Sequence, residues 1–416
     1  MEKIYGLLGR KLGHSWSAPI HHELGCGSYR LIELEPQELG AFLARGDIGG
    51  LNVTIPYKRD VMAYCDVIDD AAKAIGSVNT IVRRADGKLY ACNTDAAGFL
   101  YMARRAGISF AGKKVAVLGS GGASLTARSM AAQAGAREVV VISRSGENNY
   151  QNLSRHADTD IVVNATPVGM FPHNGEAPLD LTAFPRCCGV LDLIYNPRRT
   201  ALLMQAEALG IPCSDGLPML VAQAVAAEEH FFDKAIPESE TERILGKLRA
   251  QMTNIVLIGM PGSGKTTIGN ALAAMTGREA VDVDSEIVRR TGRAIPDIFR
   301  EDGEPAFRAL ERQVTAELGA LTGKLILTGG GVVTDERNYA PLHQNGRIYH
   351  LWRDLEVLPL DGRPVSQATG VAALWEKRRP LYERFRDVMI DNNASVESAA
   401  EAVWRDFCAH SGAERT

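Results

Sequence analysis

The chain has 416 residues, of which 45% are hydrophobic, 23% charged and 6% aromatic, a globular composition too long for one ordinary core, so two or three domains are expected. The formal net charge is -4 with acidic and basic residues interleaved, which excludes a basic patch for nucleic acid and a polybasic membrane anchor. We therefore expect small-molecule substrates, no nucleic-acid or membrane partner, a cytoplasmic location because no apolar leader opens the chain, and no particular oligomeric state.

Short apolar runs separated by helical stretches begin the chain and indicate an α/β unit. These runs occupy residues 3–8, 29–34 and 51–55. Asp86-Gly87 stands between two further β-rich runs, residues 80–83 and 88–91, and predicts a β-hairpin because Asp-Gly favours its tight turn. His21 and His22 lack metal-ligand spacing, so we expect packing or turn roles for them.

From Lys113 onward β-rich runs recur at spacings that fit crossover helices between parallel strands. They occupy residues 115–118, 138–142, 160–163 and 190–194. Residues 119–124, Gly-Ser-Gly-Gly-Ala-Ser, follow the first run and are a variant of Gly-x-Gly-x-x-Gly/Ala, which brings backbone N–H groups and a helix N-terminus to a dinucleotide. The second run ends in Ser143-Arg144-Ser145 instead of the acidic residue that holds the ribose diol of NAD. An arginine flanked by hydroxyls suits a 2′-phosphate, so NADP(H) is the predicted cofactor.

Two helical patterns then lead to the predicted domain boundary. An alanine-rich pattern covers residues 217–234, and Ser239-Glu240-Thr241-Glu242 resembles a capping box that opens a second helix to about residue 249. The polar residues 250–254 follow this helix and separate it from a new run of strand-helix alternation. We place the boundary in these residues.

The next feature is a phosphate-binding turn. Residues 259–266, Gly-Met-Pro-Gly-Ser-Gly-Lys-Thr, match Gly-x4-Gly-Lys-Ser/Thr between an apolar strand, residues 255–258, and a helix, residues 267–275. The glycines let N–H groups turn onto phosphate oxygens, Lys265 reaches the transferring phosphate, and Thr266 can ligate Mg²⁺. Because the sequence carries no Asn-Lys-x-Asp guanine signature, these features predict an ATP- and Mg²⁺-dependent kinase of a small molecule.

Further motifs follow this turn: Asp282 and Asp284, Arg308 with Glu311, three glycines at 329–331, and Arg378-Arg379-Pro380-Leu381-Tyr382. In this order they resemble shikimate kinase over residues 253 to 410. The resemblance implies that Gly262, Ser263, Gly264, Lys265, Thr266, Thr267 and Arg363 bind ATP, that Thr266 and Asp282 hold Mg²⁺, that Asp284, Arg308, Gly330 and Arg378 hold shikimate, and that Asp284, Lys265 and Arg378 are catalytic. A guanidinium pair suits this acid because each can bind a carboxylate bidentately. The segment 351–376 is shorter than the usual lid of that family.

Motifs of the first half resemble shikimate dehydrogenase over residues 1 to about 249. They lie at residues 14–17, 52–58, 78–80, 93–95, 164–170, 192–197 and 216–223. The resemblance implies that Lys58 and Asp95 are catalytic, that Ser15, Ser17, Asn52, Thr54, Asn79, Thr94, Tyr195 and Gln223 bind the substrate, and that Gly119, Ser120, Gly121, Gly122, Ala123, Ser143, Arg144, Ser145, Thr166, Leu193 and Gly216 bind NADP(H). The reaction moves a hydride and a hydroxyl proton, and either Lys58 or Asp95 carries that proton.

The sequence thus predicts an α/β protein with three domains. Residues 1–100, completed by helices of residues 217–249, form a substrate-binding domain, residues 101–216 a Rossmann-like NADP domain, and residues 253–416 a P-loop kinase domain with a parallel sheet. The predicted function is reduction of 3-dehydroshikimate to shikimate followed by phosphorylation of shikimate. Two alternatives remain open: a kinase-like half that only binds ligands, and an NAD-using quinate/shikimate dehydrogenase.

Overall fold

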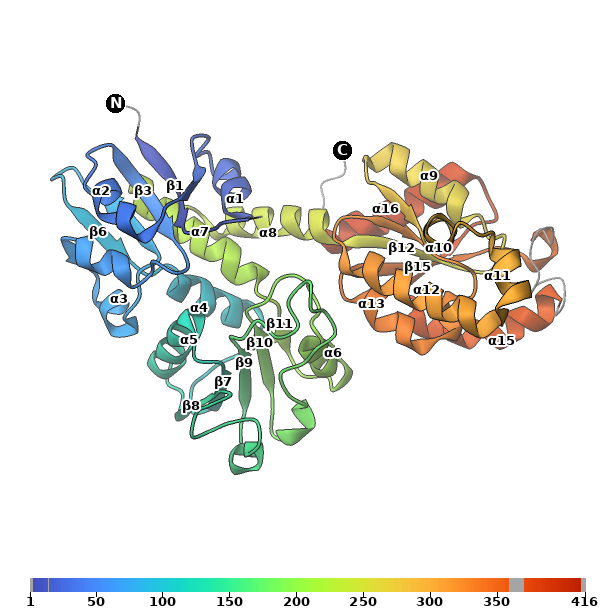
Figure 1. Cartoon of the computed structure of the whole chain (residues 1–416), viewed down its shortest axis with the longest axis horizontal. Helices are drawn as coiled ribbons and strands as arrows, with labels where there is room; N and C mark the ends of the chain where they lie inside the picture. Colours follow the sequence, from blue (N-terminus) through green and yellow to red (C-terminus); the bar gives the residue numbers. More distant parts are fainter. Residues whose placement is uncertain (1–2, 14, 359–369, 413–416) are drawn as a thin grey trace. The chain divides into compact units, whose positions relative to one another are not determined.

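The computed structural model describes residues 3–13, 15–358 and 370–412. The chain forms two compact units, one made of the residues up to 170 with 176–245, the other of residues 171–175 with 246 onward. The polar residues 250–254, where the sequence predicts a boundary, are the last residues of helix α8 (Glu238–Met252) and the start of strand β12 (Asn254–Ile258). The described residues form three β-sheets, two in the first unit and one in the second (Figure 1).

The N-terminal sheet of the first unit is mixed, with strand order β2-β1-β3-β5-β6-β4. Its strands are β1 (Ile4–Gly9), β2 (Arg30–Glu33), β3 (Ile48–Val53), β4 (Val67–Ile68), β5 (Thr80–Arg83) and β6 (Leu89–Cys92). β3 pairs in parallel with β1 and antiparallel with β5, and the predicted hairpin is the β5–β6 pair. Every residue of β3 is buried, because helices cover the sheet.

Helices of the first unit come from both ends of its sequence. They are α1 (Ser17–Glu23), α2 (Leu39–Leu43), α3 (Asp70–Ile75), α4 (Asp95–Arg105), α5 (Gly122–Gln133), α6 (Ala201–Ala208) and α7 (Leu217–Phe232). α4 and α7 pack side by side, and α7 also lies against β3 and β5 (Figure 1). A Cβ atom at Gly50 would lie 2.2 Å from the Phe231 ring, so glycine on β3 lets α7 approach the sheet closely.

The second sheet is fully parallel, with strand order β11-β10-β9-β7-β8. Its strands are β7 (Lys114–Leu118), β8 (Glu138–Ile142), β9 (Ile161–Asn164), β10 (Gly189–Asp192) and β11 (Cys213–Ser214). The four predicted parallel runs are confirmed. The chain leaves β7 toward β8 on one side and returns as β9 on the other, which opens a crevice at the carboxyl ends of β7 and β9 where such sheets bind ligands.

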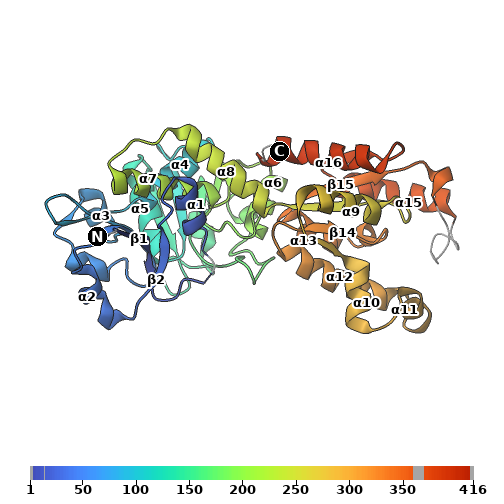
Figure 2. The ribbon, with the colours of Figure 1, turned by 90° about the horizontal axis from the view of Figure 1, so that it is seen from above.

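The second unit contains a parallel sheet of order β13-β14-β12-β15-β16. Its other strands are β13 (Ala280–Asp282), β14 (Leu325–Leu327), β15 (Gly346–Trp352) and β16 (Val388–Asp391), and its helices are α9 (Lys265–Thr276), α10 (Val283–Thr291), α11 (Ile295–Glu301), α12 (Gly303–Ala320), α13 (Tyr339–His343), α15 (Val371–Phe385) and α16 (Val396–Ser411). α9 and α16 cover one face of the sheet, and α12 and α13 cover the other (Figure 2). The predicted α/β fold is confirmed in both units.

Within the described ranges, no helix combines the length and the apolar character that crossing a bilayer would require.

A buried histidine gives the second unit a pH-dependent stability. His350 on β15 stacks on the rings of Tyr382 and Trp375, at centroid distances of 4.7 and 6.0 Å. Neither ring nitrogen has a hydrogen-bond partner among the described residues. Burial is the largest cause that lowers the pKa of His350 to about 4. Between pH 6.5 and 4, His350 therefore binds a proton in the unfolded chain but not in the folded chain. The stability of the folded unit falls as the pH falls through this range.

We expect His350→Phe to remove this pH dependence while keeping the stacking. At pH 5 the wild-type unit should lose about 2 kcal/mol relative to pH 7 from this group, and the variant should not. Urea unfolding followed by tryptophan fluorescence at both pH values measures the difference, since Trp352, Trp375 and Trp404 all lie in this unit. Equal pH dependence in the two proteins would contradict the assignment.

Candidate active sites

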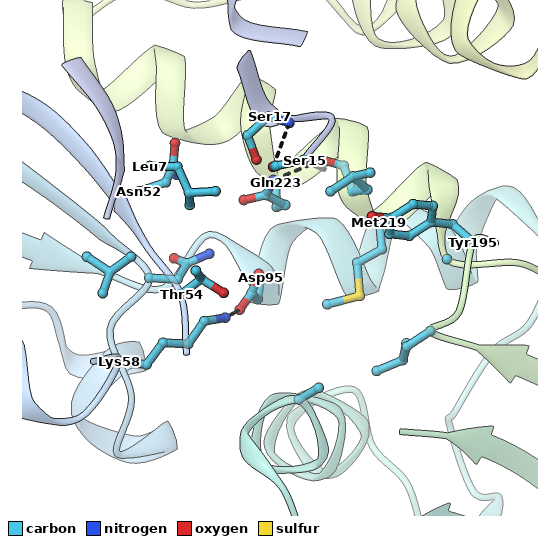
Figure 3. Close-up of a pocket in the computed structure, with 16 residues that line it drawn as sticks. Leu7, Ser15, Ser17, Asn52, Thr54, Lys58, Asp95, Tyr195, Met219 and Gln223 are labelled. Carbon is cyan, nitrogen blue, oxygen red and sulfur yellow. Dashed lines mark hydrogen bonds and ion pairs between the residues drawn. The ribbon is translucent and has the colours of Figure 1, made fainter. Parts of the chain in front are cut away.

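A polar cavity of about 290 Å³ lies in the first unit. Its wall includes the predicted residues Ser15, Ser17, Asn52, Thr54, Lys58, Asn79, Asp95, Tyr195 and Gln223, together with Ala123, Leu193 and Gly216 from the predicted cofactor set. The structure therefore brings together residues that lie up to 208 positions apart (223 − 15). Residues of the N-terminal sheet, of α4 and of α7 meet there with Ala123 of α5 and with Leu193 and Tyr195, which follow β10 of the second sheet (Figure 3).

Lys58 and Asp95 form the charged pair of this cavity. Lys58 follows β3, and Asp95 is the first residue of α4. Lys58 Nζ donates to Asp95 Oδ2 at 2.5 Å, and the side chains are 23% and 15% exposed. Figure 3 shows the two side chains pointing toward one another. An ammonium held by a carboxylate in a half-buried site can present a proton to a ligand oxygen.

Two serines and a glutamine lie at another part of the wall (Figure 3). Ser17 is buried at the start of α1, and its backbone N–H donates to Ser15 Oγ at 3.2 Å. Gln223 comes from α7 and donates to the Leu220 carbonyl at 2.9 Å. Hydroxyl and carboxamide groups at this position can hold a carboxylate or ring hydroxyls.

Sequence reasoning missed an apolar part of the same wall. Leu7, Val53, Met219 and Leu220 line the cavity without a predicted role. Met219 and Gln223 are four residues apart on α7, so they share one helix face. That spacing was visible in residues 217–232 and could have assigned Met219 to the cavity.

Thr94 is the one predicted substrate residue that does not line the cavity. It is buried behind Asn79, and its N–H and hydroxyl donate to Asn79 Oδ1 at 2.7 and 3.2 Å. A threonine directly before a helix is a common sequence feature, so its direction could not be read from the motif. Its observed contacts give it a supporting position.

The glycine-rich turn lies at the crevice between β7 and β9. Gly119 has φ 97°, and a Cβ atom there would lie 2.9 Å from Thr166 Cγ2. Nothing lies within 4 Å of a Cβ atom at Gly121 or Gly122, so the N-terminus of α5 is open to a ligand. These glycines, with Ser120, lie beside the cavity without lining it. Exposed N–H groups at a helix N-terminus fit a dinucleotide pyrophosphate.

Buried polar groups fix the loops on either side of this crevice. Asn164 Oδ1 accepts from the hydroxyl of Thr166 at 2.7 Å, and Asn164 Nδ2 donates to Asp192 Oδ1 at 3.0 Å. Asp192 also accepts from the hydroxyl of Thr200 and from the N–H of Ile194. Burial raises the pKa of Asp192 to about 6. The hydrogen bonds hold the loop that leads to Leu193 and Tyr195.

Ser143, Arg144 and Ser145 follow β8 at the same sheet edge and do not line the cavity. Arg144 is exposed and forms no ion pair with a described residue. Its positive charge lowers the pKa of Tyr150, although burial of Tyr150 is the larger effect and raises it. Arg144 is therefore placed to meet an anionic group on a nucleotide bound along this edge.

A second cavity, of about 780 Å³, lies in the second unit. The predicted residues that line it are Gly262, Gly264, Lys265, Thr266, Thr267, Asp282, Asp284, Arg308, Gly330 and Arg378. Ser263 is buried and does not line it; its carbonyl accepts from Asn392 Nδ2 at 2.6 Å. Arg363, predicted to close over ATP, lies outside the described residues. Thr266 and Asp282 share the cavity, and their oxygens suit Mg²⁺.

The three glycines after β14 permit close contacts on this wall. A Cβ atom at Gly331 would lie 2.3 Å from the Arg308 guanidinium, and one at Gly329 would lie 2.8 Å from Asp284 Oδ1. The Gly330 carbonyl accepts from Arg378 at 2.8 Å and from the Tyr382 hydroxyl at 2.6 Å. Side chains at positions 329 and 331 would displace the charged groups, and one at position 330 would collide with Pro261.

Asp284 and Glu311 place two carboxyl groups beside Arg308. Glu311 is fully buried and accepts from Arg308 at 2.7 Å. Burial raises the pKa of both carboxyls, Asp282 raises that of Asp284 further, and Arg308 lowers both. Glu311 had no predicted role, and its buried contact with Arg308 now supplies one: it orients the guanidinium. Lys265 donates to the Gly259 and Met260 carbonyls at 2.9 and 3.1 Å.

The fold and the sites define two classes of protein in one chain. A parallel sheet with a glycine-rich turn beside a Lys–Asp cavity defines a dinucleotide-dependent oxidoreductase, and the second unit is a P-loop kinase domain. The family model for the shikimate dehydrogenase substrate binding domain matches residues 7–81, and that for shikimate kinase matches residues 261–407.

Two curated relatives match the first part of the chain. Shikimate dehydrogenase (NADP(+)) of Clostridium beijerinckii is 37% identical over 247 residues, which cover 55% of this chain and 91% of that protein. The enzyme of the same name from Methanopyrus kandleri is 37% identical over 280 residues, or 59% of this chain and 96% of that protein.

Solved structures agree with these matches. A chorismate mutase/shikimate 5-dehydrogenase fusion protein from Clostridium acetobutylicum is 36% identical with TM-score 0.57, covering 60% of this chain and 97% of that one. Shikimate 5-dehydrogenase from Thermus thermophilus, in complex with NADP(H) and shikimate, is 30% identical with TM-score 0.52. The match covers 58% of this chain and 97% of that one. The chain belongs to the shikimate dehydrogenase family and carries a shikimate kinase domain after it.

Two glycines of the turn give a matched pair of variants. We expect Gly119→Ala to destabilise the first unit by about 1–3 kcal/mol, because the backbone is left-handed and the new methyl group meets Thr166. Gly121→Ala, in extended backbone with open space around it, should change stability by less than about 0.5 kcal/mol. Denaturant unfolding measures both, and equal losses would contradict the packing described.

Proposed function

We propose that this chain is a bifunctional enzyme that reduces 3-dehydroshikimate to shikimate with NADPH and then phosphorylates shikimate with ATP to shikimate 3-phosphate. The observation that carries the first activity is the Lys58–Asp95 pair, bonded at 2.5 Å in a cavity beside the glycine-rich turn. The second activity is supported by the shared cavity of the P-loop, Asp284 and Arg308. The two reactions are consecutive, since the product of one is the substrate of the other.

In the reduction, the bound nicotinamide supplies the hydride. Lys58 Nζ donates a hydrogen bond to the substrate carbonyl oxygen, which draws electron density from the carbon that accepts the hydride. Asp95 keeps the ammonium in place and balances its charge. The proton that the new hydroxyl gains comes from this pair.

The remaining polar groups of the wall position the substrate. Ser15 and Ser17 bind the carboxylate through their hydroxyls, and Asn52, Thr54, Asn79, Tyr195 and Gln223 hold the ring oxygens. Burial raises the pKa of Tyr195, so its hydroxyl stays protonated and can donate. Thr94 acts through Asn79.

We assign NADP(H) to the first domain with Arg144 as the group that meets the 2′-phosphate. Its guanidinium after β8 is exposed and forms no ion pair with a described residue, and this feature and the NADP named for relatives favour this cofactor. An NAD-using quinate/shikimate dehydrogenase is the alternative, and it predicts equal or better turnover with NADH. Comparing initial rates with NADPH and NADH decides between them.

In the kinase domain, the chain contributes charge and position. Arg308 and Arg378 bind the shikimate carboxylate, and Asp284 accepts the proton of the hydroxyl that attacks. Lys265 would neutralise the transferring phosphoryl group, while Thr266 and Asp282 would hold Mg²⁺, which would offset phosphate charge.

Replacing the cationic member of the first pair tests the dehydrogenase proposal. We expect Lys58→Ala to lower kcat for NADPH oxidation with 3-dehydroshikimate by about 10²–10⁴, because the carbonyl loses the ammonium that polarises it and the Lys58–Asp95 pair is broken. The kinase rate of the same protein with shikimate and ATP should be unchanged. Wild-type turnover in the variant would exclude Lys58 from the chemistry.

A one-pot assay tests the kinase proposal. The full chain with 3-dehydroshikimate, NADPH, ATP and Mg²⁺ should yield shikimate 3-phosphate by mass spectrometry. Asp284→Asn should instead accumulate shikimate, with a phosphorylation rate about 10²–10⁴ lower. If the wild-type chain itself stops at shikimate, the kinase-like half is a binding module, which is the alternative for this domain.

A further inference from the structure

A buried polar network stands directly behind the cavity of the first unit and has no part in the mechanism above. Tyr29 is 3% exposed, and its hydroxyl donates to Asn52 Oδ1 at 2.8 Å. Its ring lies 4.0 Å from that of His21 at an interplanar angle of 9°. His21 Nδ1 lies 2.7 Å from Glu228 Oε2, and both side chains are 0% exposed. The network runs from α7 through α1 to the cavity wall.

We propose that Tyr29, held by the His21–Glu228 pair, fixes the carboxamide of Asn52 so that its amide nitrogen faces the substrate, which makes these three residues positioning residues for substrate binding. The inference rests on the proposed dehydrogenase function and extends it to residues that do not contact the substrate.

The contacts of Asn52 with its neighbours fix the orientation of its carboxamide. Asn52 Nδ2 donates to Thr80 Oγ1 at 3.3 Å. Thr80 has one hydroxyl proton, and its oxygen lies 3.1 Å from Asn79 Oδ1 and 3.0 Å from Thr94 Oγ1. A proton used toward either neighbour leaves Thr80 as the acceptor for Asn52. The oxygen of Asn52 then has to face Tyr29, and one N–H hydrogen remains for a ligand in the cavity that Asn52 lines.

The hydroxyl of Tyr29 is a hydrogen-bond donor to Asn52. Burial raises the pKa of Tyr29 well above its usual value, and the nearby Cys26 and Glu228 add to this effect. The hydroxyl is therefore protonated, and it donates to the amide oxygen. α1 holds the residue at two points, because His21 stacks on its ring and His22 Nε2 lies 3.0 Å from its carbonyl oxygen.

The His21–Glu228 pair joins α1 to α7. A fully buried pair of this kind adds little net stability, since desolvation offsets the attraction, and its best-attested use is to fix how elements sit against one another. Ser17 lies on α1 and Gln223 on α7, so the pair sets the spacing of two substrate-binding elements as well as the ring of Tyr29.

The network therefore makes this part of the cavity wall a set of hydrogen-bond donors, which binds acceptor atoms of a ligand. Asn79 Oδ1 already accepts from Thr94 and Thr80, so its nitrogen is also the end left for a ligand. The carboxamides of Asn52 and Asn79 direct their oxygens toward protein donors behind the wall. Their N–H groups therefore face the cavity, beside the ammonium of Lys58. A ring oxygen that accepts two such bonds is discriminated from a hydrogen or methyl group at the same position.

Tyr29→Phe isolates this role, because it removes the hydroxyl and keeps the stacking on His21. Tyr57→Phe is the matched control: the Tyr57 side chain is equally buried in the same domain, but its hydroxyl donates to the Leu34 carbonyl at 2.5 Å. We expect Tyr29→Phe in the full chain to raise the KM for 3-dehydroshikimate and the calorimetric Kd of shikimate about tenfold. The KM for NADPH should stay unchanged. The kcat should change by less than about twofold, because the lost bond contributes equally to binding the substrate and the transition state.

Glu228 supplies an independent pair of variants. Glu228→Gln can still bond His21 and should keep the wild-type KM, whereas Glu228→Ala should raise it as Tyr29→Phe does. Unchanged shikimate affinity in Tyr29→Phe, or an equal change in Tyr57→Phe, would overturn the inference. Failure of the wild-type chain to reduce 3-dehydroshikimate would overturn the proposed function itself, and it is distinguishable because it concerns the unmutated protein.

Discussion

In parallel strands that are buried on both faces, polar functional side chains are placed at the ends of the strands. All five residues of β7 and of β12 are buried, and their backbone groups are satisfied within the sheet. Both strands then break at a glycine, Gly119 or Gly259, and continue into a helix whose N-terminus is directed at the same edge. Both proposed nucleotide sites of the chain depend on this constraint.

The same constraint explains why side chains from distant motifs converge. β9 and β10 end in Asn164 and Asp192, which bond each other at 3.0 Å, and β13 ends in Asp282. In each unit, polar residues at the carboxyl ends of the strands therefore lie along one edge of the sheet. Lys58, in the segment after β3, and Asp95, at the start of α4, line one cavity and form an ion pair.

Much of this could be predicted from the sequence, because strand periodicity and glycine-rich turns are local signals. The four runs of the second sheet, the hairpin at Asp86-Gly87 and the lining roles of Lys58 and Asp95 needed no tertiary information beyond the family pattern. His21 is different: a packing role was expected, but its partner Glu228 is 207 positions away and no local pattern couples them. The direction of Thr94 and the tight fit of Gly331 on Arg308 also depend on contacts between elements, which one sequence does not contain.

The return of α7 to the first sheet has a consequence for how the protein is made. Phe231 packs on Gly50, so β3 lacks its cover until the chain has been synthesised beyond residue 232. The N-terminal strands therefore complete their packing only after the second sheet, which lies between them and α7 in the sequence, has been synthesised. The kinase segment, continuous in sequence, has no such delay. Until α7 has been synthesised, the face of the N-terminal sheet that Phe231 covers lacks that contact.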